Sequence, residues 1–386
     1  MKIAHIVAGS PLPDVANGVR KFVYFIAKAQ AEIGLEVAVF FLSAEPDPAI
    51  PQVFVRGFRP ARRPFRVPTA LIGAIERWDP DILHLHSPYF PANAMLARWA
   101  RRRRLPYVIT PHGALSPGEI RQRWYLKLPY KYLFELRVLN RAAFVHAVGA
   151  AENLRSYGVT TPIEVAPCGV DEPPLPWGHD SRAFATRHRT LEGRRVFLFL
   201  GRLDPDQKGL DLLVEAFTAA HLDTAALVLV GPDYRGGRRR LQGLIDRLRP
   251  SSPVLLLDAV YGTERLEVIA GADVFVNTAR WEGMPIAVLE AAAAARPCLL
   301  TSVADPLDRL SQAGGAIRVA PRPDAIADGL RWLCGATAEE LRHMGQRARA
   351  VAVSEFQWTS SARLLAGAYA RHLSGAWSES RSGMLV

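Results

Sequence analysis

Cysteine is scarce in this chain of 386 residues, which holds only Cys168, Cys298 and Cys334 and no CxxC pair. Three distant cysteines exclude a disulfide framework and a zinc ribbon, and they favour a reducing compartment, so we expect a cytoplasmic protein. Apolar runs of about 18 residues are also absent, and we therefore expect no transmembrane helix. The N-terminal MKIAHIVAGS has one lysine and too short an apolar run for a signal peptide, so we interpret it as a core strand.

Familiar nucleotide-binding motifs are missing as well. Without GxGxxG, a Rossmann dinucleotide site is not expected, and without GxxxxGK[ST] there is no Walker loop. No DxD motif stands in a loop suited to a metal, and no internal repeat or low-complexity tract is present. The length allows two domains of ordinary size, and 49% hydrophobic with 22% charged residues is typical of a globular protein.

Positive charge is in excess, at +11, and it is concentrated in residues 101–141, which hold ten basic and two acidic residues. A basic patch of this kind is commonly a binding site for nucleic acid. Within Glu119–Arg141, however, aromatic and basic residues alternate, which suits an anionic membrane surface better. We expect this stretch to be helical and broken at Pro129. An ordinary amphipathic helix packed on a sheet is the alternative, and no nucleic-acid partner is expected.

Apolar strands alternate with amphipathic helices along the whole chain, which predicts two parallel α/β domains. In the first half we expect the helices Gly18–Ile33, Thr69–Trp78 and Ala150–Tyr157 between the strands Lys2–Gly9, Glu36–Leu42, Val53–Val55, Asp81–His86, Pro106–Thr110, Ala143–Val148 and Ile163–Ala166. Glu172–Gly178 is the expected linker. In the second half we expect the strands Arg195–Leu200, Ala226–Val230, Val254–Leu257, Asp273–Asn277, Cys298–Thr301 and Ala316–Val319. A last helix should end near Leu373, before a frayed tail at 375–386.

Two histidines in the strand DILHLH, His84 and His86, are expected to face opposite sides of the sheet. A zinc site there is unlikely in our interpretation because no third ligand stands nearby at metal-binding spacing. His112 follows the next strand, on the loop TPHGALSP. Ligands gather at the carboxyl ends of strands in open α/β sheets, so His86 and His112 are both well placed to meet one.

Two stretches of the second half carry candidate binding chemistry. FLFLGRLDPDQKGLDLLVEAF places Arg202 and Lys208 between a strand and a helix, where they could hold phosphate. RWEGMPIAVLEAAAAARPCLLT places Glu282 and Glu290 eight residues apart around a helix start. We expect free backbone N–H groups of the first turn, from Gly283, Met284 and Ile286, beside Glu282, an arrangement that binds an anion or hydroxyls.

Together these stretches resemble the retaining glycosyltransferases of family 4, which have the two-domain GT-B fold and an E-x7-E signature. Glu282 and Glu290 occupy the signature positions, and Arg202 and Lys208 occupy the diphosphate-binding pair. The TPHGALSP loop resembles the acceptor-side loop of family members that build bacterial exopolysaccharide or lipopolysaccharide, and His112 matches their functional histidine. PCGVD at 167–171 resembles the family's PNGVD turn. Gly18 matches the second glycine of the family's first loop, where Asn17 replaces the other and could still adopt a left-handed turn.

The resemblance implies two Rossmann-like, doubly wound domains facing across a cleft, with the last helix returning to the first domain. Residues 1–176 with a helix at about 355–375 would bind the acceptor, and residues 177–354 the nucleotide-sugar. The donor, expected to be a UDP- or GDP-sugar, would contact Gly18, Arg202, Lys208, Glu290 and the segment Gly283, Met284, Pro285 and Ile286. His112, Glu282, Arg202 and Lys208 would act in catalysis.

The acceptor implied is a glycan or a polyprenyl-linked glycan, and the reaction would need neither a cofactor nor a metal. The protein could attach peripherally to the inner face of the plasma membrane through 119–141. A nucleotide-sugar epimerase, or a non-catalytic nucleotide- or sugar-binding protein of the same fold, remains the alternative.

Overall fold

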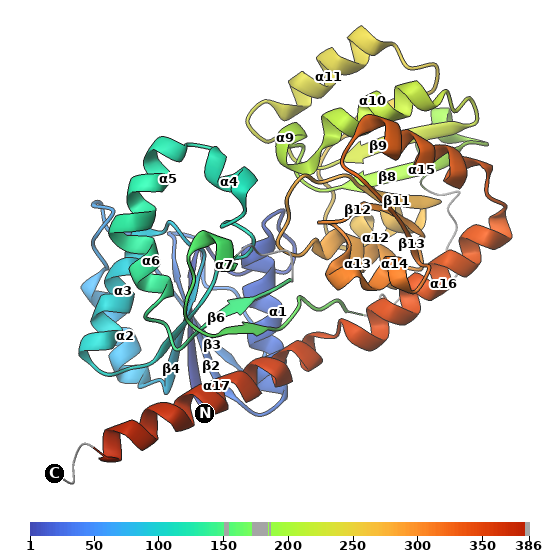
Figure 1. Ribbon diagram of the computed structural model, residues 1–386. Helices are drawn as coiled ribbons and strands as arrows, with labels where there is room; N and C mark the ends of the chain where they lie inside the picture. The colour runs from blue at the N-terminus through green and yellow to red at the C-terminus, as the bar shows by residue number, and fades with distance from the viewer. Residues whose placement is uncertain (150–153, 172–183, 185–186, 383–386) are drawn as a thin grey trace. The chain divides into compact units, whose positions relative to one another are not determined.

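The computed structural model describes residues 1–149, 154–171, 184 and 187–382 (Figure 1). The chain forms two compact units, one from residues 1–169 together with the chain from Trp358 onward, and one from Val170–Gln357. The expected linker, Glu172–Gly178, and the expected division at 176/177 lie outside the described residues, as does the first half of the expected helix Ala150–Tyr157, whose second half is α7.

The first unit is a parallel sheet of seven strands in the described chain, in the order β3-β2-β1-β4-β5-β6-β7. Its strands are β1 (Lys2–Ala8), β2 (Glu36–Leu42), β3 (Val53–Phe58), β4 (Ile82–His86), β5 (Tyr107–Thr110), β6 (Phe144–Ala147) and β7 (Ile163–Val165). Its helices are α1 (Gly18–Glu32), α2 (Thr69–Trp78), α3 (Pro91–Arg102), α4 (Pro117–Arg121), α5 (Trp124–Tyr130), α6 (Leu136–Leu139), α7 (Leu154–Tyr157) and α17 (Trp358–Ser382).

The two faces of this first sheet differ. Side chains alternate along a strand, so Ala4, Ile6, Leu83 and Leu85 enter one apolar core, together with buried residues of α2 and α3. The intervening positions face the other way, where α1 and α17 pack together. His84 and His86 are two residues apart and therefore share that second face, with their rings stacked at 4.4 Å between centroids. The expectation that they face opposite sides was wrong.

The second unit has the same doubly wound plan, with six parallel strands in its described part, in the order β10-β9-β8-β11-β12-β13. The strands are β8 (Arg195–Leu200), β9 (Ala225–Val230), β10 (Val254–Leu257), β11 (Val274–Asn277), β12 (Cys298–Thr301) and β13 (Ala316–Val319). The helices include α9 (Pro205–Lys208), α10 (Leu210–Ala220), α11 (Gly237–Leu248), α12 (Gly262–Ala270), α13 (Ile286–Ala293), α14 (Arg309–Gln312), α15 (Pro323–Gly335) and α16 (Ala338–Glu355). In each sheet the order reverses beside the first strand, and such switch points are where open α/β sheets bind ligands.

Two expected features of the helices were wrong. The stretch 119–141 breaks before α5, where Arg123 has a left-handed φ of 55°, and not at Pro129, which lies inside α5. The missing N–H of Pro129 is followed by a wider π-helical turn, Lys131–Glu135, that continues the helix. The last helix, α17, does not end near Leu373 but continues to Ser382 through the expected tail. Its membership of the first unit was predicted correctly.

Candidate active site

The candidate phosphate-binding loop follows β8 and is built from local capping. Asp204 accepts a hydrogen bond from the Gln207 backbone N–H at 3.2 Å and so caps the N-terminus of α9. This helix is a single turn that ends at Lys208. Gly209 then turns the chain into α10 with a φ of 62°, and a Cβ there would lie 2.1 Å from the Thr278 carbonyl oxygen. Only glycine fits this contact, so the loop is pressed against the end of β11.

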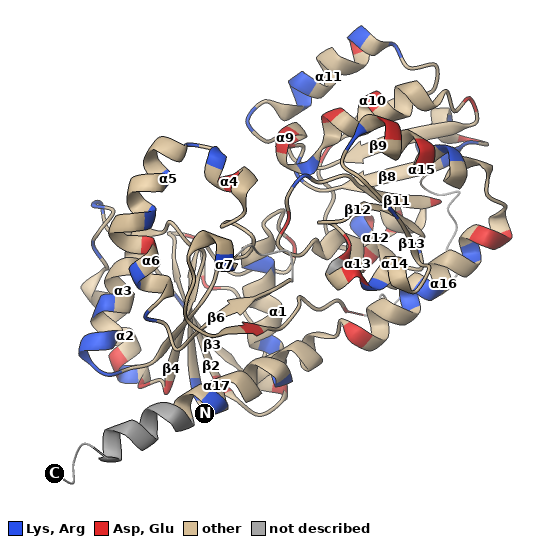
Figure 2. Ribbon diagram, in the orientation of Figure 1, with Lys and Arg blue, Asp and Glu red and all other residues tan. Residues whose placement is uncertain are grey.

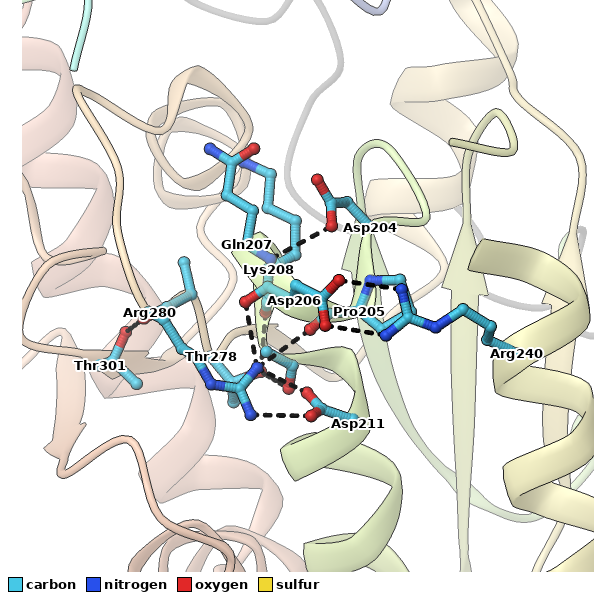
Figure 3. A network of polar contacts seen from close by, with 12 residues as sticks. Asp204, Pro205, Asp206, Gln207, Lys208, Asp211, Arg240, Thr278, Arg280 and Thr301 are labelled. Carbon is cyan, nitrogen blue, oxygen red and sulfur yellow. Dashed lines mark hydrogen bonds and ion pairs between the residues drawn. The ribbon is translucent and has the colours of Figure 1, made fainter. Parts of the chain in front are cut away.

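Arg280, for which we predicted no role from the sequence, clamps this loop in place (Figure 3). Its guanidinium contacts both carboxylate oxygens of Asp211 at 2.7 Å and donates to the carbonyls of Pro205 and Asp206 at 3.1 Å. Its backbone N–H donates to the Gln207 carbonyl at 2.9 Å. The bond to Asp211 raises the pKa of Arg280, which keeps the clamp charged. Its position two residues before Glu282 was the only signal in the sequence.

The clamped loop brings together three of the expected catalytic residues. The Lys208 ammonium forms an ion pair with the Glu282 carboxylate, and both side chains are largely buried, at 15% and 8% exposed. Arg202 reaches the same loop by donating to the Gln207 side-chain oxygen at 2.8 Å. Its guanidinium also lies 4.5 Å from the ring centroid of Tyr234, a contact that sequence reasoning missed.

The segment after Glu282 differs in one respect from expectation. Helix α13 begins at Ile286 with Pro285 as its N-cap, so Gly283 and Met284 lie in the loop before it and not in its first turn. Pro285 provides no side-chain cap, and its carbonyl accepts from Val288 and Leu289. The N–H groups of the first two helical residues, Ile286 and Ala287, have no acceptor within an α-helix and point to its N-terminal side.

Glu290 lies one turn further along α13 and is mostly buried. Its carboxylate accepts from the Arg265 guanidinium of α12 at 2.8 Å, with the two side chains 11% and 20% exposed. Arg265 is a further residue that sequence reasoning missed, because nothing in the order of residues marks a partner on a preceding helix.

Gly18 and His112 both belong to the first unit. Gly18 is the first residue of α1, and no heavy atom would lie within 4 Å of a Cβ there. Asn17 is extended, with a φ of −132°, and its side chain caps the N–H groups of Val19 and Arg20, so it does not form the left-handed turn we expected. His112 follows β5 with a φ of 54° and is half-buried, with its Nε2 3.0 Å from Nδ1 of His86.

A third imidazole stands beside His84 and His86, contrary to our expectation. His5 of β1 joins them, and one ring nitrogen from each lies within 4.8 Å of the others, which is close enough to hold a metal ion. Both nitrogens of all three rings already take part in hydrogen bonds with protein groups. A metal ion would have to break these bonds, so the residues do not fit a resident metal.

Comparison with known proteins agrees with this architecture. Over 97% of its length the chain superposes on a sucrose-phosphate synthase from Thermosynechococcus elongatus, covering 99% of that chain with a TM-score of 0.78 at 22% identity. It also superposes on the Anabaena protein HepE, solved with UDP and glucose, with a TM-score of 0.75 at 19% identity over 96% of this chain and 100% of that one. These likenesses establish the GT-B class: two doubly wound α/β domains, each built on a parallel sheet.

Sequence comparison makes the assignment more specific. The Glycosyltransferase Family 4 profile matches residues 16–172, and the Glycosyl transferases group 1 profile matches residues 194–335. A phosphatidyl-myo-inositol mannosyltransferase of Mycobacterium leprae is 26% identical over 374 residues, which cover 90% of this chain and 91% of that protein. The chain belongs to the family 4 glycosyltransferases, as the E-x7-E and Arg202–Lys208 pattern predicted.

Proposed function

We propose that this glycosyltransferase retains the anomeric configuration of the sugar it moves from a nucleoside-diphosphate donor to a hydroxyl of a glycan or lipid-linked acceptor. The observation that carries the proposal is the Lys208–Glu282 pair, which Arg280 and Gly209 hold beside Arg202 at the switch point of the second sheet. Cations held on one loop can bind the negative charge of a diphosphate, and the adjacent carboxylate can accept hydrogen bonds from sugar hydroxyls.

In the proposed step the bond between the anomeric carbon and the diphosphate oxygen breaks, and the acceptor oxygen bonds that carbon from the same face. The acceptor's proton passes to the departing phosphate oxygen. Arg202 and Lys208 stabilise the negative charge that grows on the diphosphate, as do the N–H groups at the start of α13. An ammonium has three N–H donors, so Lys208 can keep Glu282 and still donate to phosphate. Because these groups supply the positive charge, we propose that transfer needs no metal or cofactor.

The remaining site residues follow from the same proposal. Glu290, oriented by Arg265, accepts hydrogen bonds from the ribose hydroxyls, while Glu282 and the segment Gly283–Ile286 hold the sugar. In the first unit, His112 contacts a hydroxyl of donor sugar or acceptor, and the open space at Gly18 admits the donor. The second unit would thus be the donor-binding domain and the first the acceptor-binding domain, with UDP or GDP as the expected nucleotide.

The donor assignment is tested by thermal shift with UDP, GDP, ADP, dTDP and inorganic pyrophosphate, each with and without magnesium. A ligand that binds only the folded protein raises the melting temperature according to RT ln(1 + [L]/Kd). We expect one nucleoside diphosphate to bind best, with or without magnesium. Glu290→Ala should weaken its binding on the order of tenfold to a hundredfold, because hydrogen bonds to a charged group are lost, while pyrophosphate binding stays unchanged.

Glu264→Ala, which removes an exposed carboxylate of the same helix as Arg265, is the matched control. It should change the binding of neither the nucleoside diphosphate nor pyrophosphate. No shift with any nucleotide would make the non-catalytic alternative the better one. Turnover of a nucleotide-sugar without an acceptor would instead indicate an epimerase.

We also propose that the protein is peripheral to an anionic membrane, through the surface formed by α4, α5 and the π-helical turn. Its large apolar residues are exposed, with Trp124, Tyr125 and Tyr132 each 60% or 61% accessible. Arg121 and Arg123 are exposed as well. Figure 2 shows basic residues in blue in the segment around α4 and α5. Lys127, which pairs with Glu119, and Lys131, which lies over the Tyr157 ring, are half-buried and contribute less than the alternating sequence suggested.

No described helix is long and apolar enough to cross a membrane. The similarity to phosphatidyl-myo-inositol mannosyltransferases agrees with a lipid-linked acceptor.

Co-sedimentation with vesicles of phosphatidylglycerol and phosphatidylcholine tests this surface. Arg121→Gln/Arg123→Gln should weaken binding about 30-fold, because each cation at such a surface contributes about 1 kcal/mol. Trp124→Ser/Tyr125→Ser should also weaken binding, and the attachment that remains should be mainly electrostatic and therefore more sensitive to salt. Arg239→Gln/Arg247→Gln removes the same charge from exposed positions on α11 and should have no effect. Equal binding by all three variants would refute the assignment.

A further inference from the structure

A row of buried polar side chains crosses the first sheet beneath α1 and α17. Neighbouring strands supply it in spatial order, and every member is fully buried: His5 on β1, His84 and His86 on β4, Thr110 on β5 and His146 on β6. Register places His5 opposite His84, and His86 opposite Thr110. Gln30 of α1 and Tyr369 of α17 are buried against the row and complete it.

These side chains form one unbroken chain of hydrogen bonds between the Ala166 carbonyl and His112. In order, the contacts are Ala166 O with His146 Nε2 (2.8 Å), His146 Nδ1 with Thr110 Oγ1 (2.7 Å), Thr110 Oγ1 with His84 Nε2 (2.6 Å), His84 Nδ1 with Tyr369 OH (2.5 Å), Tyr369 OH with Gln30 Nε2 (3.4 Å), Gln30 Oε1 with His5 Nε2 (2.7 Å), His5 Nδ1 with His86 Nε2 (3.0 Å) and His86 Nδ1 with His112 Nε2 (3.0 Å).

The Ala166 end gives the chain a direction. A carbonyl oxygen only accepts, so His146 must donate from Nε2, and a neutral imidazole then accepts at Nδ1. The Thr110 hydroxyl must therefore donate to His146 and accept from Nε2–H of His84. His84 in turn accepts at Nδ1 from the Tyr369 hydroxyl, whose oxygen accepts from the Gln30 amide N–H.

The same rule carries the direction to the far end. The Gln30 side-chain oxygen accepts from Nε2–H of His5, and His5 accepts at Nδ1 from Nε2–H of His86. His86 then accepts at Nδ1 from Nε2–H of His112. In the reverse direction a bare His146 nitrogen would face the Ala166 oxygen, and two acceptors repel each other. Burial supports the neutral state that this requires, because it lowers the pKa of His5 and of His146 to about 4.

We propose that this buried chain fixes His112 as the Nε2–H tautomer, so that its Nδ1 accepts a hydrogen bond from a substrate hydroxyl. Gln30, Thr110 and Tyr369 are positioning residues for His112, although none of them needs to touch a substrate. The edge of the Phe22 ring, 5.0 Å from His112 between centroids, helps hold the imidazole in place. The contact with a substrate hydroxyl rests on the proposed function, whereas the tautomer does not.

The arrangement also defines what His112 does not do. A proton taken up at Nδ1 could be relayed only toward the Ala166 carbonyl, which is no proton acceptor at ordinary pH. Burial, the largest effect, lowers the pKa of His112 to about 3. His112 is thus a neutral hydrogen-bond acceptor that orients a hydroxyl, and not a general base that removes its proton.

Thr110 offers a matched pair of variants for the test. Thr110→Val keeps the shape and removes the hydroxyl, which leaves Nε2–H of His84 without an acceptor. Reversal of the chain removes that cost: His84 then donates from Nδ1 to Tyr369, and the Gln30 amide turns over so that its oxygen accepts from Tyr369 and its N–H donates to His5. His5 and His86 then donate from Nδ1 in turn. His112 would gain a proton on Nδ1. Thr110→Ser keeps the hydroxyl and should retain the original direction.

The measurement is long-range 15N–1H correlation on the full-length protein labelled with 15N-histidine, where protonated and bare ring nitrogens differ clearly in 15N shift. His112 is assigned by the signal lost in His112→Gln. We expect a bare Nδ1 in the wild type and in Thr110→Ser, and a protonated Nδ1 in Thr110→Val. With the donor identified by thermal shift, kcat/KM for transfer should fall about tenfold in Thr110→Val only, the scale of one hydrogen bond.

Each contrary result has a distinct meaning. A protonated Nδ1 in the wild type, or an unchanged His112 signal in Thr110→Val, would overturn the directional chain. Predicted tautomers with an unchanged kcat/KM in Thr110→Val would leave the chain intact and overturn the contact between His112 and substrate. Loss of turnover in Thr110→Ser as well would overturn the role of the hydroxyl.

Discussion

The first unit should lose most of its stability between pH 8 and pH 5, while the second unit should not. His5, His84, His86 and His146 are fully buried, and burial lowers the pKa of each below the ordinary 6.5. A histidine with a lowered folded-state pKa takes up its proton mainly when the chain unfolds. Its contribution is therefore complete above pH 6.5 and lost as the pH falls toward the folded-state value.

The expected size is large. At pH 5 each such histidine destabilises the folded state by about 2 kcal/mol relative to pH 8, or about 8 kcal/mol for the four that are fully buried. The half-buried His112, whose pKa is lowered as well, adds to this loss. Glu135 acts in the opposite direction, because burial raises its pKa to about 7 and the folded state binds its proton more tightly as the pH falls. This offsets about 2 kcal/mol. A loss of at least about 6 kcal/mol remains, which is comparable with the whole stability of many domains.

Calorimetry at pH 8, 7, 6 and 5 measures this directly. No histidine in the described part of the second unit is buried. The unfolding transition of the second unit should therefore keep its temperature, while that of the first unit moves to lower temperature as the pH falls. His146→Gln, which can keep both hydrogen bonds without titrating, should remove about 2 kcal/mol of the loss. His343→Gln, at an exposed position, should remove none. A first unit equally stable at pH 8 and pH 5 would mean that its histidines are not held neutral by burial.

Lys208→Met should lower kcat for transfer by a factor of about a hundred to a thousand. It keeps most of the side-chain volume and removes the charge that we propose to stabilise the leaving diphosphate, and losing one positioned group of this kind has an effect of that order. Arg240→Met is the control, because it removes a cation of the same neighbourhood that contacts Asp206 with about half of each side chain exposed (Figure 3). It should leave kcat within about twofold.

Stability has to be separated from catalysis in this experiment, because Lys208→Met also leaves the 8% exposed Glu282 carboxylate without its partner. Breaking a buried ion pair costs several kcal/mol, so the melting temperature should fall as well. The double variant Lys208→Met/Glu282→Gln removes both charges and should recover stability but not turnover. If the double variant recovered turnover too, neither Lys208 nor Glu282 would be needed at the reacting centre, and their ion pair would be structural only.

Local patterns were enough to predict most of the fold. Glu36–Leu42, Arg195–Leu200, Val254–Leu257 and Cys298–Thr301 are the observed bounds of their strands, because continuous apolar runs between polar loops determine buried parallel strands. Errors arose where a local rule was misapplied or outweighed. Two histidines in such a run share one face by strand period alone, and a wider helical turn accommodates Pro129.

The site could be predicted only as far as single positions carry a family pattern. Lys208 and Glu282 are candidates for that reason, but their direct pairing was not predicted, since 74 residues separate them. Arg265 and Arg280 were missed because each acts through a partner far along the chain. The hydrogen-bond chain behind His112 is the extreme case: Tyr369 and His84 are 285 residues apart, and no pattern in either neighbourhood points to the other.

The contribution of Tyr369 from α17 also constrains how this protein is made. The first unit is discontinuous: its sheet is complete by Gly169, but α17 leaves the ribosome only after the whole of the second unit. Until then the face with the buried histidines is covered by α1 without α17, and the link that Tyr369 makes between His84 and Gln30 is missing. The second unit, which is continuous in sequence, can fold first during synthesis. A nascent chain halted before Trp358 would thus carry a finished second unit and a first unit whose histidine face is open to chaperones.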